Sequence, residues 1–597
     1  MVKERGMLLF HKRKHGGGTR CHRQFAFYFL LCIALFAPSL CCGAPIDDAI
    51  RQQQQIQQQQ EQRRQELERQ HLEGLEKPPS GEDLRLPEVP QAAPGATCFQ
   101  AKSIELKGVT LLSRSEVDSI TKKYLGKCLT LNDVNNLVRD VTNAYIDKGY
   151  VTTRAVIPQQ DLSAGHLVIL VVEGKVEGIE FKDGQGAVRE LRGAFPGIAG
   201  EYLNLRDIEQ GLDQMNRLPS NNAKMELVPG DEPGTSRIVV ENEPSRSWRL
   251  SAGLDNSGQD STGRNQYILT FGKDNLLEMN DLLDLHINGD AEAWTNGEHQ
   301  KSGTINGFYS IPLGYWTFST SLSRYDYRTT IKSGASEYSS AGNTTTTSLS
   351  VDRVLRRDAN SKTSLGLSYT HRDTQNYFSG VKLAATSQVL AVAGASLNHS
   401  HRLFGGLVSG QVGISHGLPI LGAERDRNPA PDTPRAQFSK VIFGGSYYRP
   451  FTIEKTNFTW STRFSGQWSE HTLYSAERIS IGSRYTVRGF HEDSLSGDTG
   501  VYIRNELAMD MTGISGTASL MAKMLGKAQL YAGYDAGIIK SDDKELEERG
   551  SLQGAVLGVR TSGGNIVMDM AIAKPLDAPA SMINDDLEFY TSIQYAF

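Results

Sequence analysis

The C-terminal stretch of the chain, residues 587–597, alternates strictly between two kinds of side chain. The positions that share one face are apolar, aromatic or β-branched: Leu587, Phe589, Thr591, Ile593, Tyr595 and Phe597. A period of two is that of a β-strand with one apolar and one polar face. A tilted strand of about 10 residues can cross a bilayer. A soluble sheet would show this alternation occasionally, whereas here it recurs over more than half of the chain.

Composition is compatible with a membrane barrel. Only 39% of the residues are apolar and the mean hydropathy is −0.38. Lipid-facing and lumen-facing side chains alternate in a barrel, so its average hydropathy stays low. After the signal-like N-terminus we find no apolar run of about 18 residues, so no transmembrane helix is expected. The net charge of −5, without a basic stripe, gives no indication of nucleic-acid binding.

Residues 1–44 are predicted to be an export signal. A basic segment precedes the apolar run Phe25–Phe36, and the small residues Gly43 and Ala44 follow it. The run is too short for a membrane-spanning helix. The basic segment is unusually long, which leaves Met7 as an alternative start, and a buried core helix is the other interpretation.

Cysteine usage agrees with export. Four of the six cysteines lie in or beside the signal, which leaves Cys98 and Cys128 for the mature chain. Such a pair in an exported protein predicts a disulfide. A metal site needs more ligands than this pair offers, so no metal and no cofactor are expected.

Residues 45–76 form a polar, glutamine-rich segment with high helix propensity. Its apolar residues are too sparse for a core-facing stripe, so composition alone favours a disordered or transiently helical segment. Residues 77–97 are rich in proline and predict an extended, semi-rigid linker.

Two tandem α/β domains are predicted next, at residues 98–174 and 175–244. Leu129, Asp133, Val138 and Val141 in the first recur as Leu203, Asp207, Leu212 and Met215 in the second, at a constant offset of about 74 residues. Each copy is expected to have the order β-α-α-β-β, with a helix whose apolar face carries Leu131, Val134, Val138, Val141 and Tyr145 in the first copy. Neither copy contains a convergent nucleophile or metal-ligand cluster.

Residues 245–597 are predicted to be β throughout. The spacing of alternating runs and turns, roughly 22 residues per strand and loop, gives about 16 strands, and single-chain outer-membrane barrels have even strand numbers. The fold class is therefore mainly β, a transmembrane antiparallel barrel preceded by two small α/β domains. A soluble β-sandwich array or a propeller is the alternative.

A long irregular stretch separates two of these strands and contains Val487, Arg488, Gly489 and Phe490. An arginine between apolar residues, beside a glycine, is unusual in a solvent-exposed loop and favours a loop folded into the lumen. Its guanidinium would need a carboxylate in a forked contact. The candidate is Asp535, with Gly533 and Gly537 on the same strand face leaving room for the docked tip.

The chain resembles the outer-membrane transporters of two-partner secretion, which belong to the superfamily of POTRA-bearing outer-membrane barrels. Matching motifs are VRGF at 487–490 and GYDAG at 533–537. GLDNSGQDSTGRNQY at 253–267, YSIPLGYWTFSTSLSRYDY at 309–327 and CFQAKSIELKGV at 98–109 match as well. At the Gly533 position the family often has an aromatic residue.

This resemblance implies two POTRA domains in the periplasm of a Gram-negative cell and a 16-stranded barrel in the outer membrane. Residues 45–76 would be a helix that plugs the lumen, Arg488 would pair with Asp535, and Tyr595 and Phe597 would act as the membrane-insertion signal. The expected partners are a large secreted exoprotein (a haemolysin, an adhesin or a contact-dependent inhibition toxin) and outer-membrane lipid. The transporter is expected to be a monomer without enzymatic activity and to pass unfolded cargo without ATP.

Three other classes of protein fit the sequence less well: a barrel assembly factor, a porin and a hydrolase. A barrel assembly factor usually has more POTRA domains, and a porin needs none. A hydrolase is suggested only by the G-x-S-x-G match at Gly413–Gly417, which lacks the helix that this motif requires.

Overall fold

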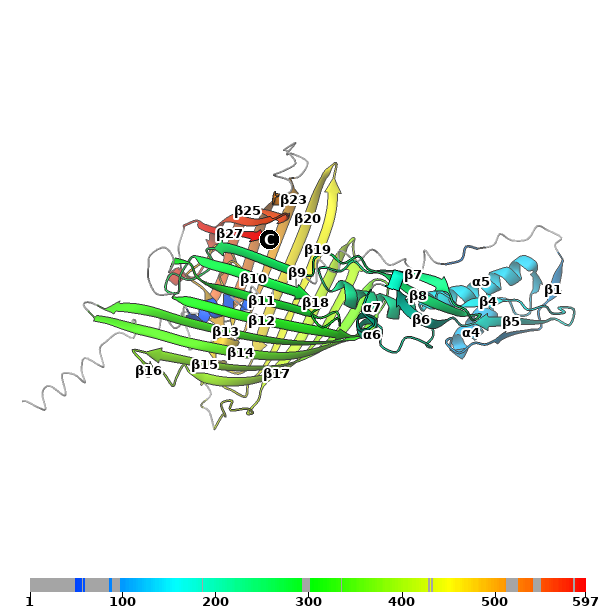
Figure 1. The fold of residues 1–597 in the computed structure, drawn as a ribbon, viewed down its shortest axis with the longest axis horizontal. Helices are drawn as coiled ribbons and strands as arrows, with labels where there is room; N and C mark the ends of the chain where they lie inside the picture. Colours follow the sequence, from blue (N-terminus) through cyan, green and yellow to red (C-terminus); the bar gives the residue numbers. More distant parts are fainter. Residues whose placement is uncertain are drawn as a thin grey trace, which may run out of the picture.

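In the computed structural model, a closed β-barrel occupies residues 248–596 and two small domains extend from one of its ends (Figure 1). The structure describes residues 49–55, 57–58, 85–88, 97–184, 186–292, 301–333, 336–427, 430, 433–511, 524–540, 549–582 and 586–597. The predicted signal (1–44), most of the linker (77–97) and much of the predicted helix (45–76) lie outside the described residues. Among those described, no helix has the length and apolar character needed to cross a membrane.

Sixteen antiparallel strands close the barrel. They are β9 (Trp248–Asp255), β10 (Gln266–Asp274), β11 (Leu282–Asp290), β12 (Ser302–Leu313), β13 (Trp316–Ser333), β14 (Ser336–Arg357), β15 (Ser361–Phe378), β17 (Gln388–Leu403), β18 (Gly406–Gly417), β19 (Ser439–Ile453), β20 (Thr456–Ser469), β23 (Gly500–Asp510), β24 (Gly526–Ile539), β25 (Gly550–Gly563), β26 (Ile566–Asp577) and β27 (Glu588–Ala596). The two-residue β16 (Val381–Lys382) only extends the end of β15. Strand β27 pairs with β9, from Ser592–Asp255 to Ala596–Ser251, so the sheet has no free edge. The predicted barrel is confirmed, and the sandwich and propeller alternatives are excluded.

The terminal strand shows how the alternation is used. Phe589, Ile593 and Tyr595 point outward and remain 44–50% exposed, as expected for side chains that face lipid. Tyr590, on the opposite face, points into the lumen and is 1% exposed. The G-x-S-x-G match at 413–417 lies within barrel strand β18, without the strand-to-helix turn of a hydrolase.

The first α/β domain contains a three-stranded sheet in the order β2-β5-β4 covered by two helices. Its elements are β1 (Cys98–Gln100), β2 (Ser103–Lys107), α4 (Arg114–Thr121), β3 (Cys128–Thr130), α5 (Leu131–Asp147), β4 (Arg154–Val156) and β5 (His166–Val172). Helix α5 buries Val134, Leu137, Val141 and Tyr145 against the sheet. Leu131 is 71% exposed, so its assignment to the apolar face was wrong. It is the first residue after the Thr130 N-cap, where the chain has not yet turned toward the core.

The second α/β domain repeats this topology with its own core. Its sheet order is β6-β8-β7, and the central strand β8 is parallel to β6, as the central strand β5 is to β2 in the first domain. The elements are β6 (Lys175–Phe181), η1 (Lys182–Gly184), α6 (Val188–Ala194), α7 (Leu205–Asn216), β7 (Lys224–Pro229) and β8 (Thr235–Glu241). Leu129 and its repeat partner Leu203 are both buried, at 2% and 0% exposure, so equivalent residues occupy equivalent core positions.

The second domain is fastened to the barrel end. The guanidinium of Arg357, at the end of β14, pairs with the carboxylates of Asp213 and Glu209 on α7. The side-chain amide of Gln214 donates to the Gly314 carbonyl (2.8 Å) in the β12–β13 turn. Arg217 donates to the Asn280 carbonyl (2.9 Å) in the β10–β11 turn. These polar contacts reach the β10–β11 turn, the β12–β13 turn and the end of β14, and they fix the domain against the barrel.

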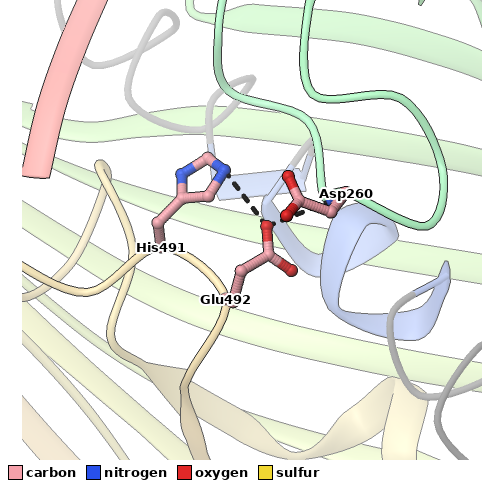
Figure 2. A group of neighbouring side chains, drawn as sticks. All are labelled: Asp260, His491 and Glu492. Atoms are coloured by element: carbon pink, nitrogen blue, oxygen red, sulfur yellow. Dashed lines mark hydrogen bonds and ion pairs between the residues drawn. The ribbon is translucent and has the colours of Figure 1, made fainter. Parts of the chain in front are cut away.

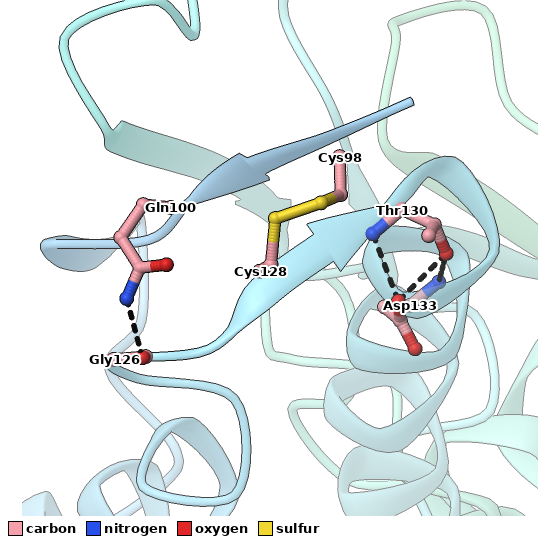
Figure 3. Close-up of a disulfide and its surroundings, with 6 residues drawn as sticks. All are labelled: Cys98, Gln100, Gly126, Cys128, Thr130 and Asp133. Atoms are coloured by element: carbon pink, nitrogen blue, oxygen red, sulfur yellow. Dashed lines mark hydrogen bonds between the residues drawn. A yellow bond between two sulfur atoms is a disulfide. The ribbon is translucent and has the colours of Figure 1, made fainter. Parts of the chain in front are cut away.

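A disulfide joins Cys98 and Cys128 on the paired strands β1 and β3 (Figure 3). Gln100 donates its side-chain amide to the Gly126 carbonyl (2.6 Å), which supports the same pair of strands. Directly after β3, Thr130 and Asp133 form a capping box at the start of α5. The disulfide therefore ties the N-terminal edge of the domain to the start of its main helix.

Replacing both cysteines with serine is expected to lower the stability of this domain by about 3–4 kcal/mol, because a loop of about 30 residues is no longer closed in the unfolded chain. Thermal unfolding of the segment 97–244, which contains the two α/β domains, checks this result. The matched control is a Ser103→Ala and Ser115→Ala variant, which leaves the disulfide intact. An unchanged melting temperature in the cysteine variant would contradict the stabilising role.

Candidate functional site in the barrel lumen

The loop between β20 and β23 folds into the barrel instead of extending into solvent. It includes the short helix η2 (Ser475–Glu477) and a two-stranded ladder of β21 (Ile479–Ile481) and β22 (Leu495–Gly497). At its base, the buried Glu477 accepts from Arg372 (2.8 Å) and pairs with Lys440 (2.9 Å), both on barrel strands. These ion pairs thus anchor the first part of the loop, which precedes the tip, to the barrel wall.

The tip places Arg488 against Asp535 of β24. Arg488 Nε donates to Asp535 Oδ2 (2.6 Å), Nη2 donates to Oδ1 (2.8 Å), and the Arg488 backbone N–H also donates to Oδ2 (3.2 Å). Side-chain exposure is only 4% for Arg488 and 0% for Asp535. This is the forked, paired contact expected from the residue types, and the two predicted partners lie together.

A second carboxylate completes the arrangement. Arg488 Nη1 donates to Glu506 Oε2 on β23 (3.0 Å), and Arg560 on β25 donates to Glu506 Oε1 (2.6 Å). Two guanidinium groups and two carboxylates therefore form one chain across β23, β24 and β25. The attraction within a buried ion pair repays its desolvation only when the remaining hydrogen-bonding atoms are also paired, as they are here.

The glycines make space for this contact. A Cβ on Gly533 would lie 2.6 Å from Arg488 Nη2, and one on Gly537 would lie 3.0 Å from Val487 Cγ2. Gly489 has φ +108°, in the left-handed region that favours glycine. The space that a side chain at Gly533 would need is taken by the Arg488 guanidinium itself.

The apolar residues of the tip fill a small cluster. Val487 and Phe490 are buried, at 0% and 4% exposure, and belong to a cluster with Ile481, Ile539 and Leu552. Tyr590 of the terminal strand holds the backbone beside them: the Gly489 N–H donates to its hydroxyl (3.1 Å), which donates to the Phe490 carbonyl (2.9 Å). The apolar residues of the tip are therefore buried in a small apolar cluster inside an otherwise polar lumen.

Residues 49–55 and 57–58 form a helix inside the same lumen (blue in Figure 1). Gln54 donates to the Ser475 carbonyl (2.7 Å) and Gln58 to the Ser480 carbonyl (3.2 Å), both in the loop. Gln52 accepts from the Tyr325 hydroxyl of β13 (3.2 Å). The ordered position of these residues corrects the disorder favoured by composition, because a wet, polar lumen supplies partners that an isolated polar helix lacks.

Sequence reasoning missed Glu506, Gly554 and Tyr590. Glu506 and Tyr590 lie at lumen-facing positions of strands whose alternation was visible, but the alternation does not say which loop each residue meets. Gly554 is close to the docked backbone, where its Cβ would clash with the Arg488 carbonyl oxygen. The other predicted pair, Tyr595 and Phe597, lies on the outer face at the chain end, with ring centroids 4.9 Å apart.

A 16-stranded barrel, with two α/β domains at one end and a lumen-docked loop, defines an outer-membrane transporter. The chain belongs to the haemolysin secretion/activation protein ShlB/FhaC/HecB family, whose model matches residues 234–561. Residues 99–174 match the ShlB-type POTRA domain and residues 175–229 match a further POTRA domain model.

Individual relatives agree with this family. The chain is 34% identical to the outer membrane transporter CdiB of Dickeya dadantii, over 81% of this chain and 84% of the relative. It is 33% identical to the hemolysin transporter protein ShlB of Serratia marcescens, over 71% and 74% of the two chains. The solved structure of CdiB from Escherichia coli matches with a TM-score of 0.84 and 31% identity, over 92% of this chain and 99% of that one.

The protein is therefore a two-partner secretion transporter of the outer membrane, with its POTRA domains in the periplasm. Members of this family are transporters, and they work with a cognate secreted exoprotein.

Proposed function

We propose that this transporter exports one large exoprotein, a haemolysin, an adhesin or a contact-dependent inhibition toxin, as an unfolded chain through its own barrel. The observation that carries this proposal is the helix of residues 49–58, which lies in the lumen and contacts both the loop and the wall. A lumen filled by this helix and a loop cannot pass a folded domain, so the helix has to leave for transport. The signal (1–44), linker (77–97) and plug (45–76) boundaries are part of this proposal.

The helix is suited to reversible release. The contacts of its described residues are mostly single hydrogen bonds from glutamine amides, and among these residues Ala49 packs against Tyr325 and Tyr327. Each such bond contributes only about 0.5–1.5 kcal/mol net, since water replaces it on release. Departure of the helix therefore exposes little apolar surface and requires no chemical energy source.

Cargo enters from the periplasm, where the sheets of the POTRA domains offer edge strands such as β7 for strand addition by an extended segment. The chain has no P-loop motif, and folding of the cargo outside the cell supplies direction. The Arg488–Asp535 contact keeps the loop docked as one face of the conduit. A closed barrel leaves no sheet edge to pair with a second copy, so the transporter acts as a monomer in outer-membrane lipid.

Replacing Gln52, Gln54 and Gln58 together with alanine is expected to increase the time that the channel spends open several-fold, because five hydrogen bonds that hold the helix are lost. Single-channel recording in planar bilayers measures this change. The control replaces Gln53, Gln55 and Gln57, which neighbour them on the same helix. Equal open times for the two triple variants would contradict the role of the helix as a plug.

Quantitative mass spectrometry of surface and medium proteins, with and without this gene in its own host, tests the function. Loss of one very large exported protein supports the proposal and identifies the cargo. A broad loss of outer-membrane barrels would overturn it in favour of an assembly factor.

A further inference from the structure

Three separate parts of the chain meet beside His491 and Glu492, just after the loop tip. The β9–β10 loop approaches from the barrel rim: Gln259 donates its amide to the His491 carbonyl (3.1 Å), and the Asp260 N–H donates to Glu492 Oε1 (3.1 Å). The lumen helix approaches from the other side, where Arg51 donates to the Glu492 carbonyl (2.9 Å). None of these contacts involves the Arg488–Asp535 pair.

The side chains at this junction converge (Figure 2). Asp260, His491 and Glu492 each offer one donor atom, and these atoms all lie within 4.8 Å of one another. His491 is nearly enclosed, with 5% of its side chain exposed, whereas Asp260 at 65% is open to solvent. The cluster therefore offers one buried metal-ligand atom, on His491, and one that is accessible to solvent, on Asp260.

The buried ring nitrogen of His491, Nε2, lacks a hydrogen-bond partner. Among the described residues, His491 Nε2 is a buried atom that makes no hydrogen bond, although Glu492 Oε1 lies 3.3 Å away. The 3.3 Å contact lacks hydrogen-bond geometry, so a proton on Nε2 would not be used, and in the Nδ1–H tautomer Nε2 presents a lone pair that a metal cation can accept. A buried polar atom left in this state is costly, which makes a bound ligand the simplest explanation.

The donor set indicates the kind of cation. One imidazole nitrogen and two carboxylates are ligands for Zn²⁺ and related first-row ions, with bonds of about 2.0–2.2 Å and a fourth position for water. Mg²⁺ and Ca²⁺ prefer oxygen ligands alone. The guanidinium of Arg264 lies 3.9 Å from Asp260 and 3.6 Å from Glu588, so Glu588 can retain Arg264 when Asp260 turns toward a metal.

We propose that Asp260, His491 and Glu492 bind one divalent transition-metal ion of the Zn²⁺ type. The ion links the β9–β10 loop to the lumen loop across 231 residues of sequence, from Asp260 to His491. It also fixes the position of the Glu492 backbone carbonyl, which accepts a hydrogen bond from Arg51. Metal binding therefore stabilises the state in which the helix occupies the lumen.

Isothermal titration of Zn²⁺ into the purified full-length chain in detergent tests this site. The starting protein carries His399→Gln and His401→Gln, because these neighbouring imidazoles, with ring centroids 6.0 Å apart, offer a separate surface site. In that background, one equivalent of Zn²⁺ should bind. Affinity should fall at least tenfold in Asp260→Asn and in His491→Gln, and stay unchanged in the matched controls Asp326→Asn and His416→Gln.

Asp260 is exposed, so Asp260→Asn keeps the test valid if the buried histidine variant fails to fold. Heat-modifiable migration on gels verifies that each variant forms the barrel. Single-channel recording adds a second readout: Zn²⁺ should shorten openings in the starting protein and have no effect in Asp260→Asn. Absence of binding in the starting protein, or equal affinity in Asp260→Asn and Asp326→Asn, would overturn the proposal while leaving the transport function intact.

Discussion

Replacing Arg488 with alanine is expected to reduce secretion of the exoprotein at least tenfold while the barrel still inserts into the outer membrane. The variant leaves Asp535, which is 0% exposed, without its forked partner. Removing one member of a buried pair costs about 3–5 kcal/mol, because the other charge stays buried. Since each 1.4 kcal/mol is a factor of ten, the loop tip should lose most of its preference for the docked position.

Secreted exoprotein in the medium, measured at equal levels of folded barrel, checks this expectation. Asp535→Ala should have a similar effect, and Arg488→Lys should be intermediate because lysine retains the charge without the planar fork. Arg324→Ala is a suitable control, since Arg324 pairs with Asp326 at an exposed position of β13. Normal secretion by both Arg488→Ala and Asp535→Ala would remove the role assigned to the pair and leave it as a structural brace.

Replacing Gly554 with alanine should produce a comparable defect without touching any charged group. A Cβ at this position of β25 would overlap the Arg488 carbonyl oxygen, and this neighbour is backbone, which cannot rotate away. The loop tip must then move, and the forked contact with Asp535 cannot form with the same geometry. We expect secretion to fall several-fold and the tip to become accessible to a cysteine-labelling reagent.

Gly410→Ala is the matched control. Gly410 also lies in a barrel strand, but its nearest neighbour to an added Cβ is the Gly444 carbonyl oxygen at 4.0 Å, an ordinary contact. Any general effect of glycine replacement on strand formation would appear in both variants. Equal secretion by Gly554→Ala and Gly410→Ala would show that close docking of the tip is unnecessary for transport.

Sequence predicted the parts of this molecule that have a local pattern. The period of two along residues 587–597 identified a membrane strand, and the offset between Leu129 and Leu203 identified a repeated domain. Arg488 and Asp535 could be paired because both were unusual where they stood, an arginine between apolar residues and an aspartate between glycines. Each of these features is a short local pattern, and the repeat is found by comparing two such patterns 74 residues apart.

What sequence could not predict depends on partners far away in the chain. Gln52 accepts a hydrogen bond from Tyr325, which lies 273 residues later, and Tyr590 donates one to the carbonyl of Phe490, 100 residues away. A polar helix looks disordered when judged alone, because the groups that receive its amides belong to another part of the chain. Leu131 shows the reverse error: its spacing fitted the apolar face of α5, but its position at the first helical residue left it in solvent.

The attachment of the second POTRA domain at three places on the barrel end has a consequence for the proposed capture of cargo by these domains. A domain on a free hinge would search a wide volume, and a segment bound to it would reach the pore only occasionally. Here the arm behaves as an extension of the barrel wall, so a captured segment is presented at one angle and one height above the mouth. Tethering of this kind raises the effective concentration of the segment at the entrance without any new contact. Weak capture is then sufficient for efficient entry, and a weakly held cargo is also released easily as it is drawn through.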